Sequence, residues 1–172
     1  MNPIVITGFM GCGKSEVAHR LALRLHLPVI DLDHEIAKRE GRTAAQLIVE
    51  EGEAAFRSIE TDTLREVLEE RIAIVALGGG AWITEQNRKL IDEHGAVSVW
   101  LDTPFEVCWQ RIEASPEDRP LGRSREQAEQ LYRLRQPIYQ LATIRLLVLA
   151  HYTVEDLVDR LEVELKKNTG IN

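Results

Sequence analysis

The chain has 172 residues, 44% of them hydrophobic, which is enough for one ordinary globular domain with a buried core. Its apolar runs, such as 144–150, are far shorter than the roughly 20 residues that span a bilayer, so we expect no membrane insertion. The formal net charge of −7 disfavours nucleic acid as a partner. Cys12 and Cys108 have neither metal-ligand spacing nor the company of a disulfide framework, so we expect a cytoplasmic protein.

Short runs of β-branched and apolar residues alternate along the chain with longer amphipathic stretches. The short runs predict strands at 3–7, 28–32, 72–77, 97–101 and 144–150. The longer stretches predict helices at about 14–25, 34–40, 44–51, 53–70, 85–94, 105–113, 124–141 and 153–167. Helix start signals stand at Thr84, at Thr103-Pro104 and at Thr153 with Asp156. This alternation predicts an α/β fold with a parallel sheet and crossover helices.

No internal repeat or Pro/Gly-rich linker divides the chain, so we expect one domain over residues 1–172. The segment 114–127 has almost no core-forming residues, which predicts either a loop that closes over an active site or an ordinary solvated loop. Positive charge gathers in and around this segment and favours a small anionic ligand over a polynucleotide; the arginines are Arg111, Arg119, Arg123, Arg125, Arg133 and Arg135.

A glycine-rich motif, GFMGCGKS, directly follows the first predicted strand at residues 8–15 and leads into a helix. It matches the P-loop pattern G-x-x-x-x-G-K-[ST], whose main-chain N–H groups and helix N-terminus bind the phosphates of a nucleotide. Lys14 would then neutralise the β- and γ-phosphates, and the Ser15 hydroxyl would bind Mg²⁺. The alternative is a glycine-rich turn that only joins a strand to a helix. A carboxylate at Glu16 would oppose the bound anion unless it turns away or pairs with a cation.

Two aspartates, Asp31 and Asp33, end the second predicted strand. Alternation along a strand predicts that both face the same way, at the carboxyl edge where open parallel sheets bind ligands. Asp31 would hold the Mg²⁺ shell through water, and Asp33 would accept the proton of an attacking hydroxyl. The alternative for Asp33 is that it caps the helix that follows it. A transition-metal site at His34 is disfavoured because no second histidine stands at a suitable spacing.

Three glycines, Gly78, Gly79 and Gly80, follow the third predicted strand and leave room for a ligand against the main chain. That strand has no acidic residue that could bind a metal, so Asp31 is the more suitable metal ligand. Two arginines are suited to bind a carboxylate bidentately. One is Arg57, which Glu60 could orient from three residues further on, although a surface ion pair is the alternative. The other is Arg135, close to a proline that we expect to interrupt its helix.

The order of the motifs GFMGCGKS, DLD, GEAAFRSIE, GGGAW, DRPL and LRQPIY resembles that of the shikimate kinase family, over residues 3 to about 142. The resemblance implies a P-loop kinase sandwich whose five-stranded parallel sheet has the order 2-3-1-4-5, an acceptor-binding region at about 33–60 and a lid at about 113–126. It implies an ATP-dependent enzyme that phosphorylates the 3-hydroxyl of shikimate, with Mg²⁺, on the pathway to chorismate and the aromatic amino acids.

The resemblance also implies roles for individual residues. The ATP phosphates would lie at Gly11, Cys12, Gly13, Lys14 and Ser15. Arg119 would close over the phosphates and assist catalysis with Lys14 and Asp33, while Arg111 would stack on adenine. Shikimate would lie at Asp33, Arg57, Gly78, Gly79, Gly80 and Arg135, and Mg²⁺ at Ser15 and Asp31.

Two other functions remain open from the sequence. One is a kinase of the same fold for another small hydroxy acid or polyol such as gluconate. The other is a catalytically weak nucleotide-binding regulatory protein, which the carboxylate of Glu16 would favour. We expect a monomer whose partners are ATP and the small-molecule acceptor.

Overall fold

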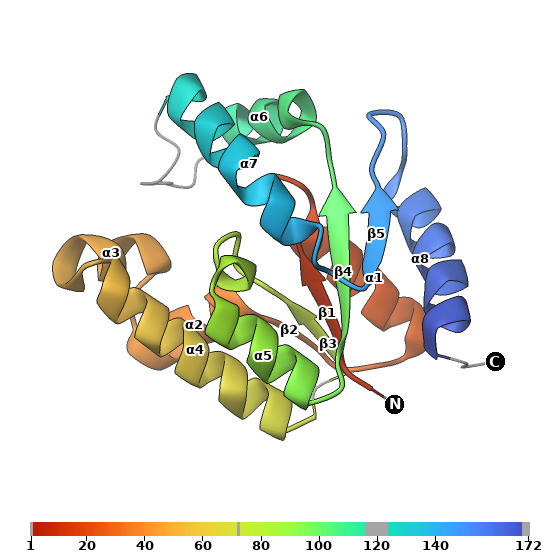
Figure 1. Cartoon of the computed structure of the whole chain (residues 1–172), viewed down its shortest axis with the longest axis horizontal. Helices are drawn as coiled ribbons and strands as arrows, with labels where there is room; N and C mark the ends of the chain where they lie inside the picture. Colours follow the sequence, from red (N-terminus) through yellow and green to blue (C-terminus); the bar gives the residue numbers. More distant parts are fainter. Residues whose placement is uncertain (1, 72, 116–123, 170–172) are drawn as a thin grey trace.

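A computed structural model describes residues 2–71, 73–115 and 124–169. Within these residues the strands form one parallel sheet in the order β2-β3-β1-β4-β5, which confirms the predicted α/β class and strand order (Figure 1). The strands are β1 (Ile4–Thr7), β2 (Val29–Asp31), β3 (Ile74–Ala76), β4 (Val97–Asp102) and β5 (Ile144–Leu147). The central strand is continuously buried because helices cover both faces of the sheet.

Each predicted helix is present with boundaries close to those expected. They are α1 (Lys14–Leu25), α2 (Leu32–Glu40), α3 (Ala44–Glu51), α4 (Glu53–Glu69), α5 (Glu85–Glu93), α6 (Phe105–Ala114), α7 (Arg125–Tyr139) and α8 (Val154–Thr169). Helices α1 and α8 pack together on one face of the sheet, and α4 and α5 lie on the other (Figure 1). No helix of the described residues is long and apolar enough to cross a bilayer.

The core lies between the sheet and these two helical layers. Its largest buried side chains include Trp82, Trp100 and Tyr139. Trp100 and Tyr139 stack with ring centroids 6.3 Å apart, and the indole N–H of Trp82 donates to the carbonyl oxygen of Ile138 at 2.9 Å. These contacts attach the end of α7 to the sheet and to the loop after β3, and this loop lies at the carboxyl edge.

We expected the second aspartate of the DLD motif at the end of the strand, but it lies in the helix that follows. Helix α2 already begins at Leu32, which is fully buried, so Asp33 lies in the first helical turn. The helix is capped by Asp31, whose Oδ1 accepts from the N–H of His34 at 3.2 Å. The alternative that Asp33 is the capping residue is therefore wrong, because the capping position belongs to Asp31.

Three smaller expectations also need correction. Pro137 does not interrupt its helix, because α7 continues through it to Tyr139 in the last turn. Thr103 does not cap α6; its hydroxyl donates to the carbonyl oxygen of Cys12 at 3.3 Å. A short 3₁₀ helix, η1 (Ala81–Ile83), follows the three glycines and was not predicted. By contrast, Thr153 and Asp156 form the expected reciprocal cap at the start of α8.

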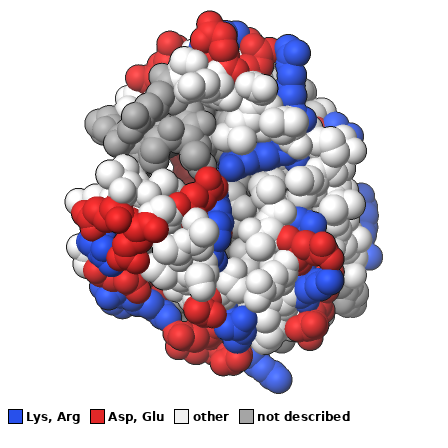
Figure 2. All heavy atoms as spheres, turned by 60° about the vertical axis from the view of Figure 1, so that its left-hand side comes forward, with Lys and Arg blue, Asp and Glu red and all other residues white. Residues whose placement is uncertain are grey.

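The region at 33–60 is tied together at its surface by ion pairs. Arg42 contacts the carboxylates of Glu50 at 2.9 Å, Glu51 at 2.6 Å and Glu40 at 3.7 Å. On the face drawn in Figure 2, which brings the side of α3 forward, acidic and basic side chains lie next to each other. Exposed pairs of this kind contribute little to stability, about 0–1 kcal/mol each. Most of the lid predicted at 113–126, including Arg119, lies outside the described residues.

Candidate active site

The connection from β1 to α1 has the backbone geometry of a phosphate-binding loop. Gly8, Gly11 and Gly13 have φ angles of 146°, 75° and 99°, which side-chain-bearing residues rarely adopt. A Cβ atom at Gly11 would lie 2.7 Å from the carbonyl oxygen of Cys108, so the loop can cross α6 only with glycine at this position. The loop motif predicted from the sequence therefore has a structural requirement for its glycines.

The N-terminus of α1 presents main-chain donors at the end of this loop. The first helical hydrogen bond runs from the N–H of Val17 to the carbonyl oxygen of Gly13, at 3.0 Å. The N–H groups of Lys14, Ser15 and Glu16 precede that bond and have no acceptor within the helix. Together with the positive end of the helix dipole, they form a binding site for an anion such as a phosphate group.

Lys14 lies over the same loop and is 9% exposed. Its Nζ donates to the carbonyl oxygens of Gly8 at 3.0 Å and Phe9 at 2.9 Å. These contacts hold the ammonium group inside the loop rather than in solvent. The lysine therefore adds its charge at the place where the terminal phosphates of a nucleotide would lie.

Ser15 and Asp31 bring two oxygen ligands together across α1 and β2. The Ser15 hydroxyl donates to Oδ2 of Asp31, while Oδ1 of the same carboxylate caps α2. A hydroxyl beside a carboxylate suits Mg²⁺, which takes few protein ligands and keeps water and phosphate oxygens. The described residues contain no group of three or more His, Cys, Asp or Glu side chains that could hold a metal alone. The donor set therefore fits a cation that is bound together with a nucleotide.

Arg57 and Glu60 form a partly buried pair on α4 rather than the surface pair considered above. Nη1 of Arg57 contacts both carboxylate oxygens of Glu60, at 3.0 and 2.8 Å, and Glu60 is 1% exposed. Nη2 of Arg57 also contacts Glu53 at 3.2 Å. Burial raises the pKa of Glu60 to about 7, while the charge of Arg57 opposes this rise and that of Asp33 adds to it. The guanidinium of Arg57 is thus held in one orientation by two carboxylates.

Two of the three glycines after β3 make room for the side chains of Asp33 and Arg57. A Cβ at Gly78 would lie 2.5 Å from Oδ1 of Asp33, and a Cβ at Gly80 would lie 2.7 Å from Cζ of Arg57. Glycine is required here so that a carboxylate and a guanidinium can lie against the main chain. This is a more specific role than the open turn for a ligand that the sequence suggested.

The middle glycine, Gly79, accepts hydrogen bonds from two side chains of α7. Its carbonyl oxygen accepts from Nη1 of Arg135 at 3.2 Å and from the hydroxyl of Tyr139 at 2.6 Å. Arg135 is only 7% exposed, and its charge acts on buried Glu60. The two predicted arginines therefore approach the same site, Arg57 from α4 and Arg135 from α7.

The P-loop and the glycine loop after β3 lie side by side at one edge of the sheet. A Cβ at Gly79 would be 3.4 Å from the main-chain nitrogen of Met10, so the glycine loop after β3 lies against the P-loop. On the other side of the P-loop, Nη1 of Arg111 donates to the carbonyl oxygen of Gly11 at 3.3 Å. This position is compatible with the nucleotide side of the site that was expected for Arg111.

The residues that support the P-loop from α7 were missed by the sequence reasoning. The hydroxyl of Tyr132 donates to the carbonyl oxygen of Thr103 at 2.9 Å, and Thr103 in turn contacts Cys12 of the loop. The ring of Tyr132 also packs edge-on against Phe9, with centroids 5.2 Å apart. No local signal could reveal these contacts, because the partners are separated by 29 to 123 positions in sequence. Tyr139, in contrast, lies within the LRQPIY motif.

A nucleotide-type phosphate loop beside a pair of arginines and an aspartate defines the class of P-loop phosphotransferases that act on small molecules. Comparisons with known proteins identify the family within this class. A family model described as shikimate kinase matches residues 10–166. Because the match covers most of the chain, the chain belongs to the shikimate kinase family.

Individual relatives agree with this assignment. The chain is 43% identical to the shikimate kinase of Streptococcus suis over 142 residues, which cover 80% of this chain and 85% of that protein. It is 36% identical to the shikimate kinase of Ruegeria pomeroyi over 160 residues, with coverages of 91% and 81%. The solved structure of shikimate kinase from Acinetobacter baumannii in complex with shikimate has a TM-score of 0.89, at 29% identity, and covers 98% of this chain and 95% of that one.

The buried carboxyl of Glu60 predicts a pH-dependent contribution to stability. Its pKa in the folded protein, about 7, is above the ordinary value of 4.5, so the folded state binds its proton more tightly than the unfolded state does. The stabilising contribution is therefore complete below about pH 4.5 and is lost as the pH rises to about 7. Urea unfolding of the protein and of Glu60→Gln at a series of pH values measures this contribution as the difference between their free energies of unfolding.

We expect the free energy of unfolding of the unsubstituted protein, relative to that of Glu60→Gln, to fall as the pH rises toward 7 and to level off above it. Titrations of groups distant from Glu60 are common to both proteins and cancel in this difference. A difference that stays constant, or that grows with pH, would contradict the assignment of the raised pKa to Glu60.

Proposed function

We propose that this chain transfers the γ-phosphate of ATP to the 3-hydroxyl of shikimate and releases ADP and shikimate 3-phosphate. Use of ATP follows from its membership of the shikimate kinase family. The observation that carries the choice of acceptor is the convergence of Asp33, Arg57 and Arg135 on the glycine loop that lies against the P-loop. Two arginines match a carboxylate, and a carboxylate beside them matches a hydroxyl. The acceptor is therefore a small hydroxy acid that carries both groups.

The acceptor residues have distinct tasks in this proposal. Arg57 and Arg135 bind the carboxylate of shikimate, and Glu60 orients the guanidinium of Arg57 for that contact. Asp33 binds the reacting hydroxyl and accepts its proton as it attacks. Gly79 and its two neighbours lie along the acceptor, and their lack of side chains keeps Asp33 and Arg57 close to it.

The nucleotide side is built mostly from main-chain groups. Residues 11–15 bind the phosphates, Lys14 neutralises the β- and γ-phosphates, and Arg111 lies beside the loop on the side of the adenine. Ser15 and Asp31 hold Mg²⁺, which supplies positive charge to the transferring phosphate group when it is bound. A catalytic role for Arg119 stays a prediction, because that residue lies outside the described part of the chain.

The transfer itself needs little from the protein beyond position and charge. The acceptor oxygen forms a bond to the γ-phosphorus while the bond from that phosphorus to the bridging oxygen of ADP breaks. The proton of the hydroxyl passes to Asp33, and Lys14 stabilises the charge that develops on the phosphate oxygens. In this proposal residues 1–172 act as one kinase domain, in which the region at 33–60 binds the acceptor and that at 113–126 acts as a lid.

The role of Asp33 is tested by Asp33→Asn, which keeps the shape of the side chain but removes its basicity. We expect kcat with shikimate to fall by about a hundredfold to ten-thousandfold, the usual contribution of a general base. ADP affinity, measured by calorimetric titration, should stay within about twofold, because Asp33 does not belong to the nucleotide side. Lys14→Ala, as the complementary variant, should abolish turnover too, but with loss of ADP affinity. Near-normal turnover of Asp33→Asn would refute the assignment.

An assay of ATP consumption with different acceptors separates this function from its competitors. ATP consumption should depend on shikimate, and gluconate in its place should give no consumption above background. Stimulation by gluconate alone would identify another acceptor, while nucleotide binding without turnover of any acceptor would identify a regulatory protein.

The fit between Gly80 and Arg57 gives a further prediction. In Gly80→Ala the new Cβ would displace the guanidinium of Arg57, so we expect the KM for shikimate to rise about ten- to a hundredfold, as in Arg57→Ala. In an Arg57→Ala background the same substitution should have little further effect, because the group that it displaces is gone. Additive increases in KM would show that Gly80 acts by another route.

A further inference from the structure

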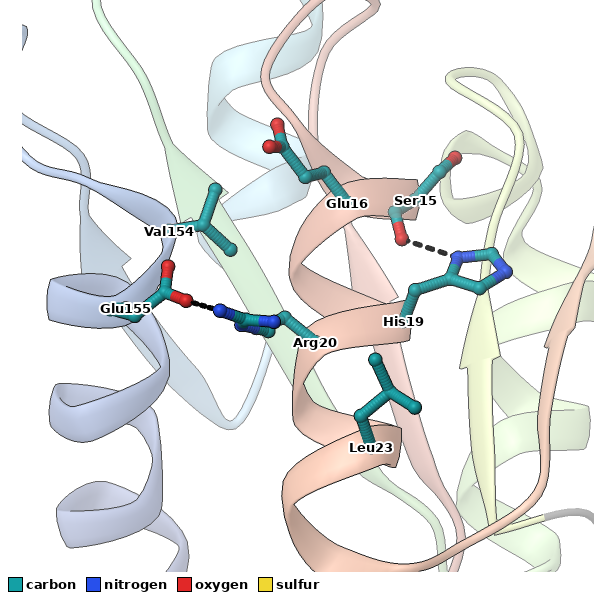
Figure 3. A pocket seen from close by; sticks show the side chains of 7 residues that line it. All are labelled: Ser15, Glu16, His19, Arg20, Leu23, Val154 and Glu155. Atoms are coloured by element: carbon teal, nitrogen blue, oxygen red, sulfur yellow. Dashed lines mark hydrogen bonds and ion pairs between the residues drawn. The ribbon is translucent and has the colours of Figure 1, made fainter.

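A surface pocket of about 620 Å³ lies between α1 and α8, next to the N-terminus of α1 (Figure 3). Its lining includes Glu16, His19 and Arg20 from α1 and Glu155 from α8. The first turn of α1 forms one end of this pocket, and the N–H groups that would bind phosphate are located in that turn. None of the site roles assigned above uses these four side chains.

Glu16 has two cationic or ionisable neighbours at helical spacing, but the structure engages both elsewhere. Nδ1 of His19 lies 2.7 Å from the carbonyl oxygen of Ser15. Arg20, four residues after Glu16, forms its ion pair with Glu155 of α8. Figure 3 shows the carboxylate of Glu16 at the end of α1, directed away from the guanidinium of Arg20. Among the described residues no ion pair neutralises Glu16.

The position of Glu16 places its charge close to the proposed phosphate site. Its own N–H is one of the donors that precede the first helical hydrogen bond of α1. Side chains in a helix lean toward the N-terminus, so the carboxylate leans toward those donors as well. A negative charge in the first helical turn interacts favourably with the helix dipole and competes there with a bound anion.

We propose that Glu16 is an affinity-determining residue that weakens nucleotide binding at the P-loop, and that Glu155 maintains this effect by holding Arg20 away from it. This inference rests on the proposed nucleotide function of the loop. A glutamate four residues before an arginine is the favoured orientation for an ion pair within a helix, so Arg20 would neutralise Glu16 if it were free to do so. Glu155 competes successfully because it lies in the first turn of α8, where the dipole of that helix also stabilises the carboxylate.

ATP and ADP share their α- and β-phosphates, so a charge beside the loop that binds phosphate weakens the binding of both nucleotides. Such uniform weakening raises the KM for ATP without slowing the chemical step. It also shortens the lifetime of the ADP complex, and product release limits the turnover of many enzymes. Glu16 therefore tunes occupancy and release of nucleotide rather than phosphate transfer.

Titration of ADP into the protein without acceptor tests this proposal. We expect Glu16→Gln to bind ADP about two- to fivefold more tightly than the unsubstituted protein, the range for an exposed charge pair. Glu155→Gln should also tighten ADP binding, but by less, because Arg20 then neutralises Glu16 only in part. The double variant should bind ADP as Glu16→Gln does, since without the carboxylate of Glu16 the position of Arg20 no longer matters.

A matched control is available one turn further along the same two helices. Asp159 of α8 pairs with Arg24 of α1, so Asp159→Asn removes an α1–α8 ion pair away from the P-loop. We expect its ADP affinity to be unchanged. Raising the salt from about 0.1 M to about 1 M, which shortens the screening length from about 10 Å to about 3 Å, should abolish the advantage of Glu16→Gln.

The outcomes separate this inference from the function on which it rests. Failure of every variant and of the unsubstituted protein to bind ADP would overturn the nucleotide function and this inference with it. Equal ADP affinity of the unsubstituted protein and Glu16→Gln would overturn the inference alone. Additive effects of Glu16→Gln and Glu155→Gln would overturn the proposed link between the two residues. Tighter ADP binding by Glu16→Gln that persists at high salt would show that Glu16 does not act through its charge.

Discussion

The site depends on the close approach of two loops at the carboxyl edge of the sheet, where no side chain separates their main chains. The main-chain nitrogen of Met10 lies against Gly79, while Gly78 and Gly80 leave room for Asp33 and Arg57. If the glycine loop after β3 moved outward, Arg135 and Tyr139 would lose the carbonyl oxygen of Gly79 that accepts their hydrogen bonds. Catalysis of phosphoryl transfer consists almost entirely of positioning the two reactants and stabilising the charge that develops. The loop contact is therefore the constraint that joins the two halves of the site.

Charges of both signs meet around this contact, and their pairing explains why Glu60 and Arg135 can be buried. Arg57 and Arg135 bring two positive charges to the site, and Glu60 and Asp33 bring two carboxyl groups. An isolated buried charge costs several kcal/mol, but a paired one with good hydrogen bonds is tolerated. Burial raises the pKa of Glu60 to about 7, since the attraction of Arg57 does not fully offset the loss of hydration. The four groups thus form one cluster in which each charge acts on its neighbours.

The sequence predicted the sheet order, by resemblance, and nearly all element boundaries, because buried parallel strands and amphipathic helices have strong periodic signals. It failed at Asp33, where strand alternation was extended by two residues into a helix whose first residue, Leu32, is buried like a strand residue. The contacts of Tyr132 and Thr103 with the P-loop could not be read from the sequence, because they join segments that are distant along the chain. Resemblance to a family predicted which residues form the site. The close approaches of Asp33 and Arg57 that require two of the three glycines appear only in the folded structure.

The two halves of the site differ in the kind of group that binds the ligand, and this explains why one was easier to predict. Main-chain N–H groups at a helix N-terminus are positioned by local backbone geometry, so a motif of eight residues predicts them. Side chains from α2, α4 and α7 form the acceptor half, and their arrangement depends on how those helices pack. In the proposed function, a substitution among these side chains would change acceptor binding and leave the phosphate loop intact. The nucleotide half is open to change mainly where a side chain lies beside the main-chain donors, which in this chain is the position of Glu16.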